Sequence, residues 1–103
     1  MKYMVTWDDR PMGSASEYES SHQRLLSVFG QWKAPSSFSI LAFVVRIGEV
    51  GGYMLVETDN PLDIHRFANT FSMIEFKVHP VADVGAAVSV ELEAMAWRDS
   101  LPN

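Results

Sequence analysis

Glu57 and His79 are the side chains best suited by type and position to exchange a proton near neutral pH. A histidine titrates in that range without help, and burial beside apolar groups raises the pKa of a carboxyl towards it. Glu57 ends an apolar stretch, and His79 lies on the polar side of an alternating one. We therefore treat both as candidate catalytic bases. The plainer interpretation makes Glu57 an ion-pair partner and His79 a strand-end residue beside Pro80.

Four further residues could bind a ligand. Trp7 and Tyr53 could form an aromatic wall for a flat, apolar molecule. Arg46 could add a charged floor if it shares a sheet face with Tyr53, and His22 lies on the inward face of a predicted helix. The structural alternative is the more frequent one for such residues. It makes the aromatic rings core filling, Arg46 one half of a weak cross-strand ion pair and His22 a satisfied core or interface residue.

The composition excludes several kinds of site. The 103 residues include no cysteine, so disulfides, thiolate catalysis and cysteine metal ligands are absent. The three histidines lack the spacing of a metal site, and we expect neither a metal nor a cofactor. The net charge is −5 without any basic cluster, which argues against a nucleic-acid partner.

The hydropathy pattern gives no sign of a membrane segment. The most apolar run, at 40–47, is too short to span a bilayer as a helix. The N-terminal stretch is too short and too soon interrupted by charge to be a signal peptide. We therefore expect no membrane partner and a cytoplasmic location.

A glycine-rich hairpin organises the chain. The run at 40–47 is rich in β-branched and aromatic residues and suits a strand buried on both faces, and 53–58 forms the return strand. Arg46 shares a face with Tyr53 and Glu57 if the turn holds two residues. It lies on the opposite face if the turn holds three, because a slip of one residue reverses every side chain.

The other elements follow from capping signals and periodicity. Ser14 and Glu17 match a capping box, and Asn60 before Pro61 is a second N-cap. The predicted order is a strand at 3–7, a helix from the capping box to Gly30, strands at 40–47 and 53–58, a helix after Asn60, a strand at 73–81 and a helix at about 84–98. This is a β-α-β-β-α-β order followed by an extra C-terminal helix.

Such an order predicts one ferredoxin-like α+β domain over residues 1–103, with a four-stranded antiparallel sheet and helices on one face. The bare face should be largely apolar, and a two-fold dimer would cover it and close a dimeric α/β barrel. The C-terminal helix is apolar on two sides. We predict that it packs against another subunit. The alternative, that it lies on its own domain, is about equally well supported by the sequence alone.

Three segments resemble a known family. They are Met4-Val5-Thr6-Trp7, the stretch from Gly52 to Pro61, and Phe76-Lys77-Val78-His79-Pro80-Val81. They resemble the DUF3303 family within the dimeric α/β-barrel superfamily. The resemblance implies the fold and a homodimer. Relatives in that superfamily include cofactor-independent monooxygenases, small isomerases and dehydratases, but a fold does not fix a function.

Two hypotheses of function follow. In the first, a homodimer binds a small apolar or aromatic ligand in a cavity between sheet and helices or partner, conceivably as a cofactor-independent monooxygenase-like or isomerase-like enzyme. In the second, the protein is a non-enzymatic dimeric binding or structural module with no open pocket. The sequence does not decide whether the protein is an enzyme.

Overall fold

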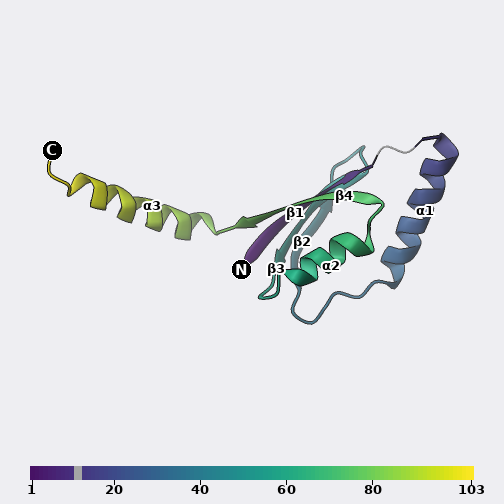
Figure 1. Ribbon diagram of the computed structural model, residues 1–103, viewed down its shortest axis with the longest axis horizontal. Helices are drawn as coiled ribbons and strands as arrows, with labels where there is room; N and C mark the ends of the chain where they lie inside the picture. Colours follow the sequence, from purple (N-terminus) through teal and green to yellow (C-terminus); the bar gives the residue numbers. More distant parts are fainter. Residues whose placement is uncertain (11–12) are drawn as a thin grey trace.

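A computed structural model describes residues 1–10 and 13–103 (Figure 1). The elements are β1 (Lys2–Asp9), α1 (Ala15–Gln31), β2 (Ser39–Val45), β3 (Gly51–Glu57), α2 (Leu62–Thr70), β4 (Ile74–Val81) and α3 (Val84–Asp99). The sheet is four-stranded and antiparallel. The expected ferredoxin-like α+β fold with an extra C-terminal helix is therefore confirmed.

The sheet has the strand order β2-β3-β1-β4, so β1 is central. Val5 of β1 lies opposite Met54 on one side and Val78 on the other. Because side chains alternate along a strand, these residues share the face that the helices cover. Near the start of the chain, the Thr58 amide donates to the Met1 carbonyl at 3.0 Å, which ties the beginning of β1 to the end of β3.

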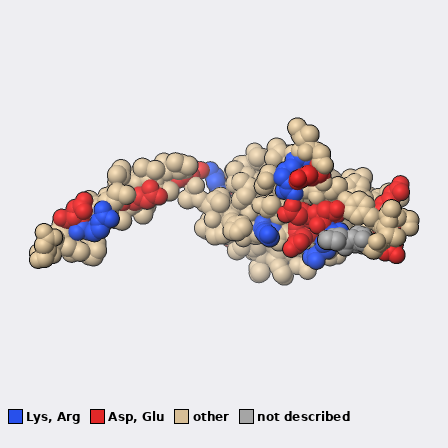
Figure 2. All heavy atoms as spheres, turned by 90° about the horizontal axis from the view of Figure 1, so that it is seen from above, with Lys and Arg blue, Asp and Glu red and all other residues tan. Residues whose placement is uncertain are grey.

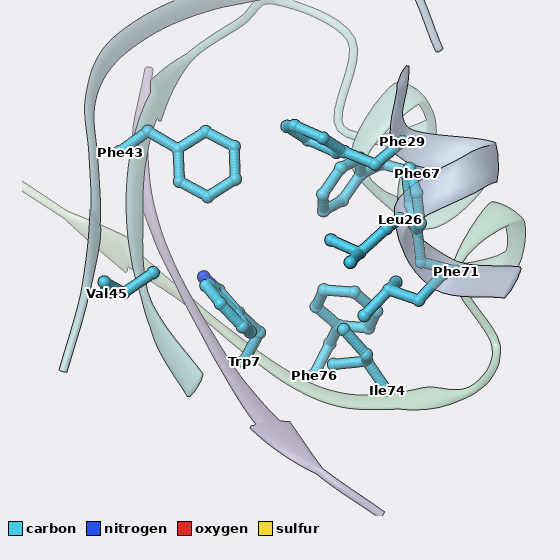
Figure 3. Close-up of a pocket in the computed structure, with 10 residues that line it drawn as sticks. Trp7, Leu26, Phe29, Phe43, Val45, Phe67, Phe71, Ile74 and Phe76 are labelled. Carbon is cyan, nitrogen blue, oxygen red and sulfur yellow. The ribbon is translucent and has the colours of Figure 1, made fainter. Parts of the chain in front are cut away.

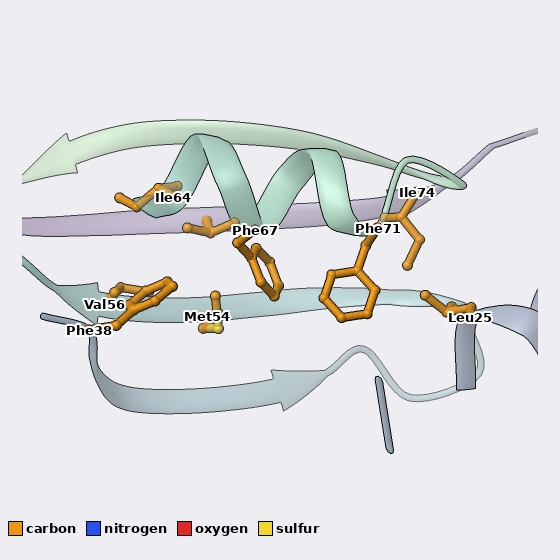
Figure 4. Packing of buried hydrophobic residues seen from close by; sticks show 9 residues of the cluster. Leu25, Phe38, Met54, Val56, Ile64, Phe67, Phe71 and Ile74 are labelled. Atoms are coloured by element: carbon orange, nitrogen blue, oxygen red, sulfur yellow. The ribbon is translucent and has the colours of Figure 1, made fainter. Parts of the chain in front are cut away.

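The core lies between the sheet and α2 (Figure 4). Val5, Met54 and Val56 of the sheet are completely buried. Phe67 of α2 and Phe71, the C-cap residue that follows the helix, point towards the sheet, and their ring centroids are 5.0 Å apart. Phe67 and Phe71 are four residues apart, the spacing that places side chains on one side of a helix. This spacing therefore brings both rings into the core.

The first turn of α2 differs by one residue from the sequence-based expectation. The helix begins at Leu62, with Pro61 as its cap, and Asn60 lies just before it. The Asn60 carbonyl accepts from the Asp63 amide at 3.0 Å, and the Asn60 amide donates to the Thr58 hydroxyl at 3.0 Å. The Ser37 hydroxyl donates to the buried Asp63 carboxylate, so the helix start is tied to the loop before β2.

The expectation that β2 is buried on both faces is wrong for this chain. β2 is an edge strand, and all seven of its residues are exposed. One of its faces carries Phe43 and Val45, and the other carries Val44. Neither face is covered, because α1 stands at the end of the sheet instead of lying along β2 (Figure 1). The apolar character on both sides is real, but residues 1–10 and 13–103 leave it exposed.

Helix α3 extends away from the rest of the molecule (Figure 1). It makes the molecule 67 Å long and 21 Å thick. The radius of gyration is 18.8 Å, whereas a compact domain of this length has about 13 Å. At the start of α3, Asp83 pairs with Lys2 at 2.8 Å and makes no capping bond with its side chain.

Gly52 offers a test of the sheet. It is buried opposite Trp7, and an added Cβ would overlap the Val44 carbonyl oxygen and come within 2.9 Å of the Trp7 indole. We expect Gly52→Ala to lower the free energy of unfolding by about 1–3 kcal/mol through overpacking, measured by urea denaturation.

Gly85→Ala is the matched control, because nothing lies within 4 Å of its Cβ position at the start of α3. It should leave the free energy of unfolding unchanged or raise it by up to about 1 kcal/mol. Equal effects of the two substitutions would contradict the packing described around Gly52.

Candidate functional site

An apolar cavity of about 360 Å³ opens between the sheet and the two helices that flank it (Figure 3). We call it the Trp7 cavity. Its volume falls within the range of small-molecule sites. Every lining residue is apolar or aromatic: Trp7, Leu25, Leu26, Phe29, Phe43, Val45, Phe67, Phe71, Ile74 and Phe76.

The walls of the cavity follow from simple periodicities. Trp7 lies opposite Phe76 in the pairing of β1 and β4, so both rings stand on the helix-side face of the sheet. Leu26 and Phe29 are three residues apart on α1 and therefore share one side of that helix. Phe43 reaches across the cavity, with its ring centroid 6.3 Å from Trp7 and 5.7 Å from Phe29, edge to face in both cases. Such pairs contribute about 0.5–1.5 kcal/mol each beyond their buried area.

One polar atom belongs to this apolar site. The Trp7 indole nitrogen, Nε1, is buried and has no hydrogen-bond partner among the described residues. It lies on the edge of the ring that faces Phe43 and Val45 across the cavity (Figure 3). Leaving a buried donor unsatisfied costs about 1–3 kcal/mol. Because the atom itself is buried, a molecule in the cavity could accept this hydrogen bond only after the indole ring turns towards it.

Of the six candidate site residues, only Trp7 lines the cavity. Tyr53, Glu57, Arg46 and His79 belong to the opposite side of the sheet, which no helix covers and which we call the open face. The open face also carries Ala42 and Val44 of β2, Leu55 of β3, Met4 and Thr6 of β1 and Lys77 of β4. Glu57 lies opposite Lys2 and His79 opposite Met4, so the whole width of β1 separates the two candidate bases.

Arg46 shares the open face with Tyr53 and Glu57, although the turn is longer than expected. The Arg46 amide donates to the Gly51 carbonyl at 2.9 Å, which leaves four residues, 47–50, in the turn. Side chains alternate along a strand, so a turn of four residues places Arg46 on the same face as a turn of two. The Arg46 side chain therefore lies on the face predicted for a two-residue turn. Gly48 supplies the positive φ of 84° that this turn needs.

The Arg46 guanidinium is occupied by its neighbours and does not pair with Glu57. It donates to the carboxylates of Glu49 and Asp8, and its central carbon lies 5.4 Å above the Tyr53 ring. Hydrogen bonds to Glu49, Tyr53 and Asp8 raise the pKa of Arg46 further above its ordinary value. Arg46 therefore stays charged and holds the hairpin to β1. This geometry favours a structural role for Arg46 over a role in ligand binding.

His22 lies beside a second, much smaller hollow near the N-terminal half of α1. The hollow measures about 10 Å³ and is lined in part by Asp9 and Tyr18, so it holds at most one water molecule. The rings of Tyr18 and His22 stack with centroids 6.3 Å apart. Asp9 raises the pKa of the Tyr18 hydroxyl by hydrogen bonding, with smaller contributions from burial and from its charge.

Two negative observations apply to the described part of the chain. Residues 1–10 and 13–103 contain no group of three histidine, aspartate or glutamate side chains placed to hold a metal ion. In the same residues, every helix is too short or too polar to cross a membrane.

Sequence reasoning missed most of the cavity. Leu26, Phe29, Phe43 and Val45 line it, and none of them is among the candidate site residues drawn from the sequence. The strand at 40–47 does contain a signal of the cavity, because it carries apolar residues on both faces although it lies at the edge of the sheet. Such excess apolar surface marks a binding region when the chain itself does not cover it.

The fold and the cavity define a ferredoxin-like α+β protein with an aromatic pocket on the helix side of its sheet. The family model described as "Domain of unknown function (DUF3303)" matches residues 1–95. The chain belongs to this family, and the resemblance seen in the sequence is confirmed. No curated protein matches the chain.

The contact between Tyr18 and Asp9 predicts a pH effect. In a variant carrying Tyr3→Phe and Tyr53→Phe, Tyr18 is the remaining tyrosine, and its ultraviolet titration should give a pKa above the ordinary 10.0. The folded form holds this proton more tightly than the unfolded form. The stabilisation is therefore complete below pH 10 and is lost as the pH rises through the raised value. Adding Asp9→Asn should return the pKa towards 10, and an unchanged pKa would contradict the contact.

Proposed function

We propose that this protein is a homodimer that binds a small, neutral, largely aromatic molecule in the Trp7 cavity. The observation that carries the proposal is a cavity of about 360 Å³ with apolar walls and one unsatisfied donor, Nε1 of Trp7. A well-formed apolar pocket with a single convergent polar group has the composition of an ordinary small-molecule site.

The lining also indicates the chemical class of the ligand. None of the ten lining residues is ionisable, so a charged ligand would lose its hydration without gaining a partner. An indole N–H can only donate, so a ligand that turns the Trp7 ring enough to reach Nε1 needs an acceptor, such as a ketone, quinone or lactone carbonyl. These features favour a neutral ring system with one carbonyl near Trp7 over an aromatic acid.

The positions of the candidate bases favour binding over catalysis in this cavity. Glu57 and His79 belong to the open face, on the other side of the sheet from the Trp7 cavity. Neither side chain is within hydrogen-bond reach of a molecule in the cavity, so neither can exchange a proton with it. Catalysis by Glu57 or His79 would require a different site, formed on the open face by a second subunit.

The open face supports the homodimer. On the β2 and β3 side of this face, Val44 is 54% exposed and Tyr53 is 40% exposed, and Leu55 and Met4 lie beside them. Contrary to the expectation from the sequence, the open face is not largely apolar, because Arg46, Glu57, Lys77 and His79 share it, but this exposed apolar patch favours association. A two-fold axis lying parallel to the face would bring the same patch of two copies together, which is the usual geometry of a homodimer.

The ligand class can be tested with three molecules of one shape. Naphthoquinone offers a carbonyl, naphthalene offers none, and 2-naphthoate carries a charge. We expect naphthoquinone to bind about fivefold more tightly than naphthalene, the value of one net hydrogen bond, and naphthoate to bind more weakly than either. Isothermal titration calorimetry measures the three affinities.

Trp7→Phe keeps an aromatic ring but removes Nε1, so it should abolish the preference for the quinone over naphthalene. Glu57→Gln is the control on the opposite face and should change none of the three affinities. Failure of all three molecules to bind, or equal binding of naphthoate, would refute the proposed ligand class.

The dimer can be tested by light scattering at micromolar concentration, where the protein should have about twice the mass of one chain. Val44→Lys places a charge in the apolar patch of the open face and should weaken dimerisation at least tenfold. Ile47→Lys is the matched control, because Ile47 lies fully exposed in the hairpin turn. A monomeric wild-type protein, or a dimer unaffected by Val44→Lys, would contradict pairing through the open face.

A further inference from the structure

Helix α3 packs against no other element of the described chain. All but one of its residues are exposed, including Val90 at 63%, Leu92 at 60% and Trp97 at 67%. Figure 2 shows broad uncharged surface along the helix between a few charged side chains. The family match extends to residue 95, so most of this helix lies within the residues that the family model matches.

The apolar residues of α3 form two stripes on different sides of the helix. At 100° per residue, one stripe contains Val84, Val88, Leu92 and Met95, and the other contains Val90, Ala94 and Trp97. A helix with a single apolar stripe can lie on one surface, but a helix with two needs a neighbour on each side. The surface that receives α3 should therefore be a groove with two apolar walls.

The mouth of the Trp7 cavity is such a groove. Leu26 and Phe29 on α1 form one wall and are 57% and 42% exposed. Phe43 and Val45 on β2 form the other wall and are 40% and 62% exposed. The two walls face each other across the cavity (Figure 3), and the Phe29 and Phe43 rings meet edge to face with centroids 5.7 Å apart. The same chain thus carries an unpartnered helix with two apolar sides and an unfilled groove with two apolar walls.

The helix cannot fill the groove of its own chain in this arrangement. α3 leaves the sheet at the carboxyl end of β4, whereas the cavity is lined by Ile74 at the amino end of that strand. Eight residues of strand separate the two ends by about 26 Å. Only residues 82 and 83 connect β4 to α3, which is too short a linker to lead the helix back.

We propose that α3 of a second copy of this chain lies across the mouth of the Trp7 cavity, against α1 and β2, and that the exchange is reciprocal. The proposal rests on the homodimer proposed above. If the two-fold axis runs across the strands, it brings the carboxyl end of β4 in one copy beside the amino end of β4 in the other. The exchanged helix then starts at the end of the sheet where the groove opens.

The size of the contact suits a stable dimer. A helix of 16 residues is about 24 Å long and about 10 Å wide, and each copy gives one helix and receives another. Burying both apolar sides of each helix reaches the order of 800 Å² per partner that specific interfaces bury. The second copy then supplies the missing wall of the ligand site and keeps water from the Trp7 indole.

Cross-linking tests the position of α3, because the natural chain has no cysteine. Leu92→Cys in a tagged chain is co-expressed with Val45→Cys in an untagged chain and treated with a short bismaleimide. Val44→Cys replaces Val45→Cys in the matched control. Val45 and Val44 are neighbours on β2 but point to the groove and to the open face respectively. We expect a cross-linked heterodimer with Val45→Cys and little or none with Val44→Cys.

A stronger cross-link from Val44→Cys, equal cross-links from both, or none from either would overturn the proposal. Binding provides a second measurement. Leu92→Glu should weaken naphthoquinone binding at least tenfold, whereas Ser89→Glu, which adds the same charge between the two stripes, should change it less than twofold. Equal effects would also overturn the proposal. If the wild-type dimer binds naphthoquinone but the Val45→Cys cross-link fails, only the position of α3 is refuted, and the proposed function stands.

Discussion

A single helix is too narrow to cover a sheet of four strands. Neighbouring strands lie about 4.8 Å apart, so the outer strands of this sheet are separated by about 14 Å, whereas a helix is about 10 Å wide. α2 packs beside β4 and seals Val5 and Met54 beneath it. α1 would have to cover the remaining half, but it stands at the end of the sheet (Figure 1). The uncovered strip above β2 becomes the Trp7 cavity.

The path of α1 explains why the cavity stays open. After α1 ends at Gln31, Trp32 packs against Phe67 of α2 and against Phe71 at the C-cap of that helix, with ring centroids 5.1 and 6.0 Å away. This aromatic contact holds the end of α1 beside α2 and away from β2. Phe29 still reaches Phe43, but only as a bridge across the gap. The pocket therefore stays open because the contacts of Trp32 hold the end of α1 away from β2.

The sequence predicts the fold well because the fold depends on local patterns. The alternation of Ile74 and Phe76 with Glu75 assigns β4 and both of its faces correctly, and the Ser14 cap accepts from the Glu17 amide as the capping box implies. The cavity was largely missed because periodicity shows which side of an element is apolar but not how far apart two elements stand. For the same reason β2 was expected to be buried. Of the candidate site residues, only Trp7 was assigned to a pocket that the structure contains.

The three tryptophans occupy three different environments. Trp7 borders the cavity, Trp32 is packed among the phenylalanines between the helices, and Trp97 stands in water on α3. Indole fluorescence shifts towards shorter wavelengths as water leaves the ring. The intrinsic emission of this protein is therefore a sum of three local reporters, one for the pocket, one for the folded core and one for the projecting helix. With each of the other two indoles replaced in turn, occupancy, unfolding and assembly could be followed separately without an added dye.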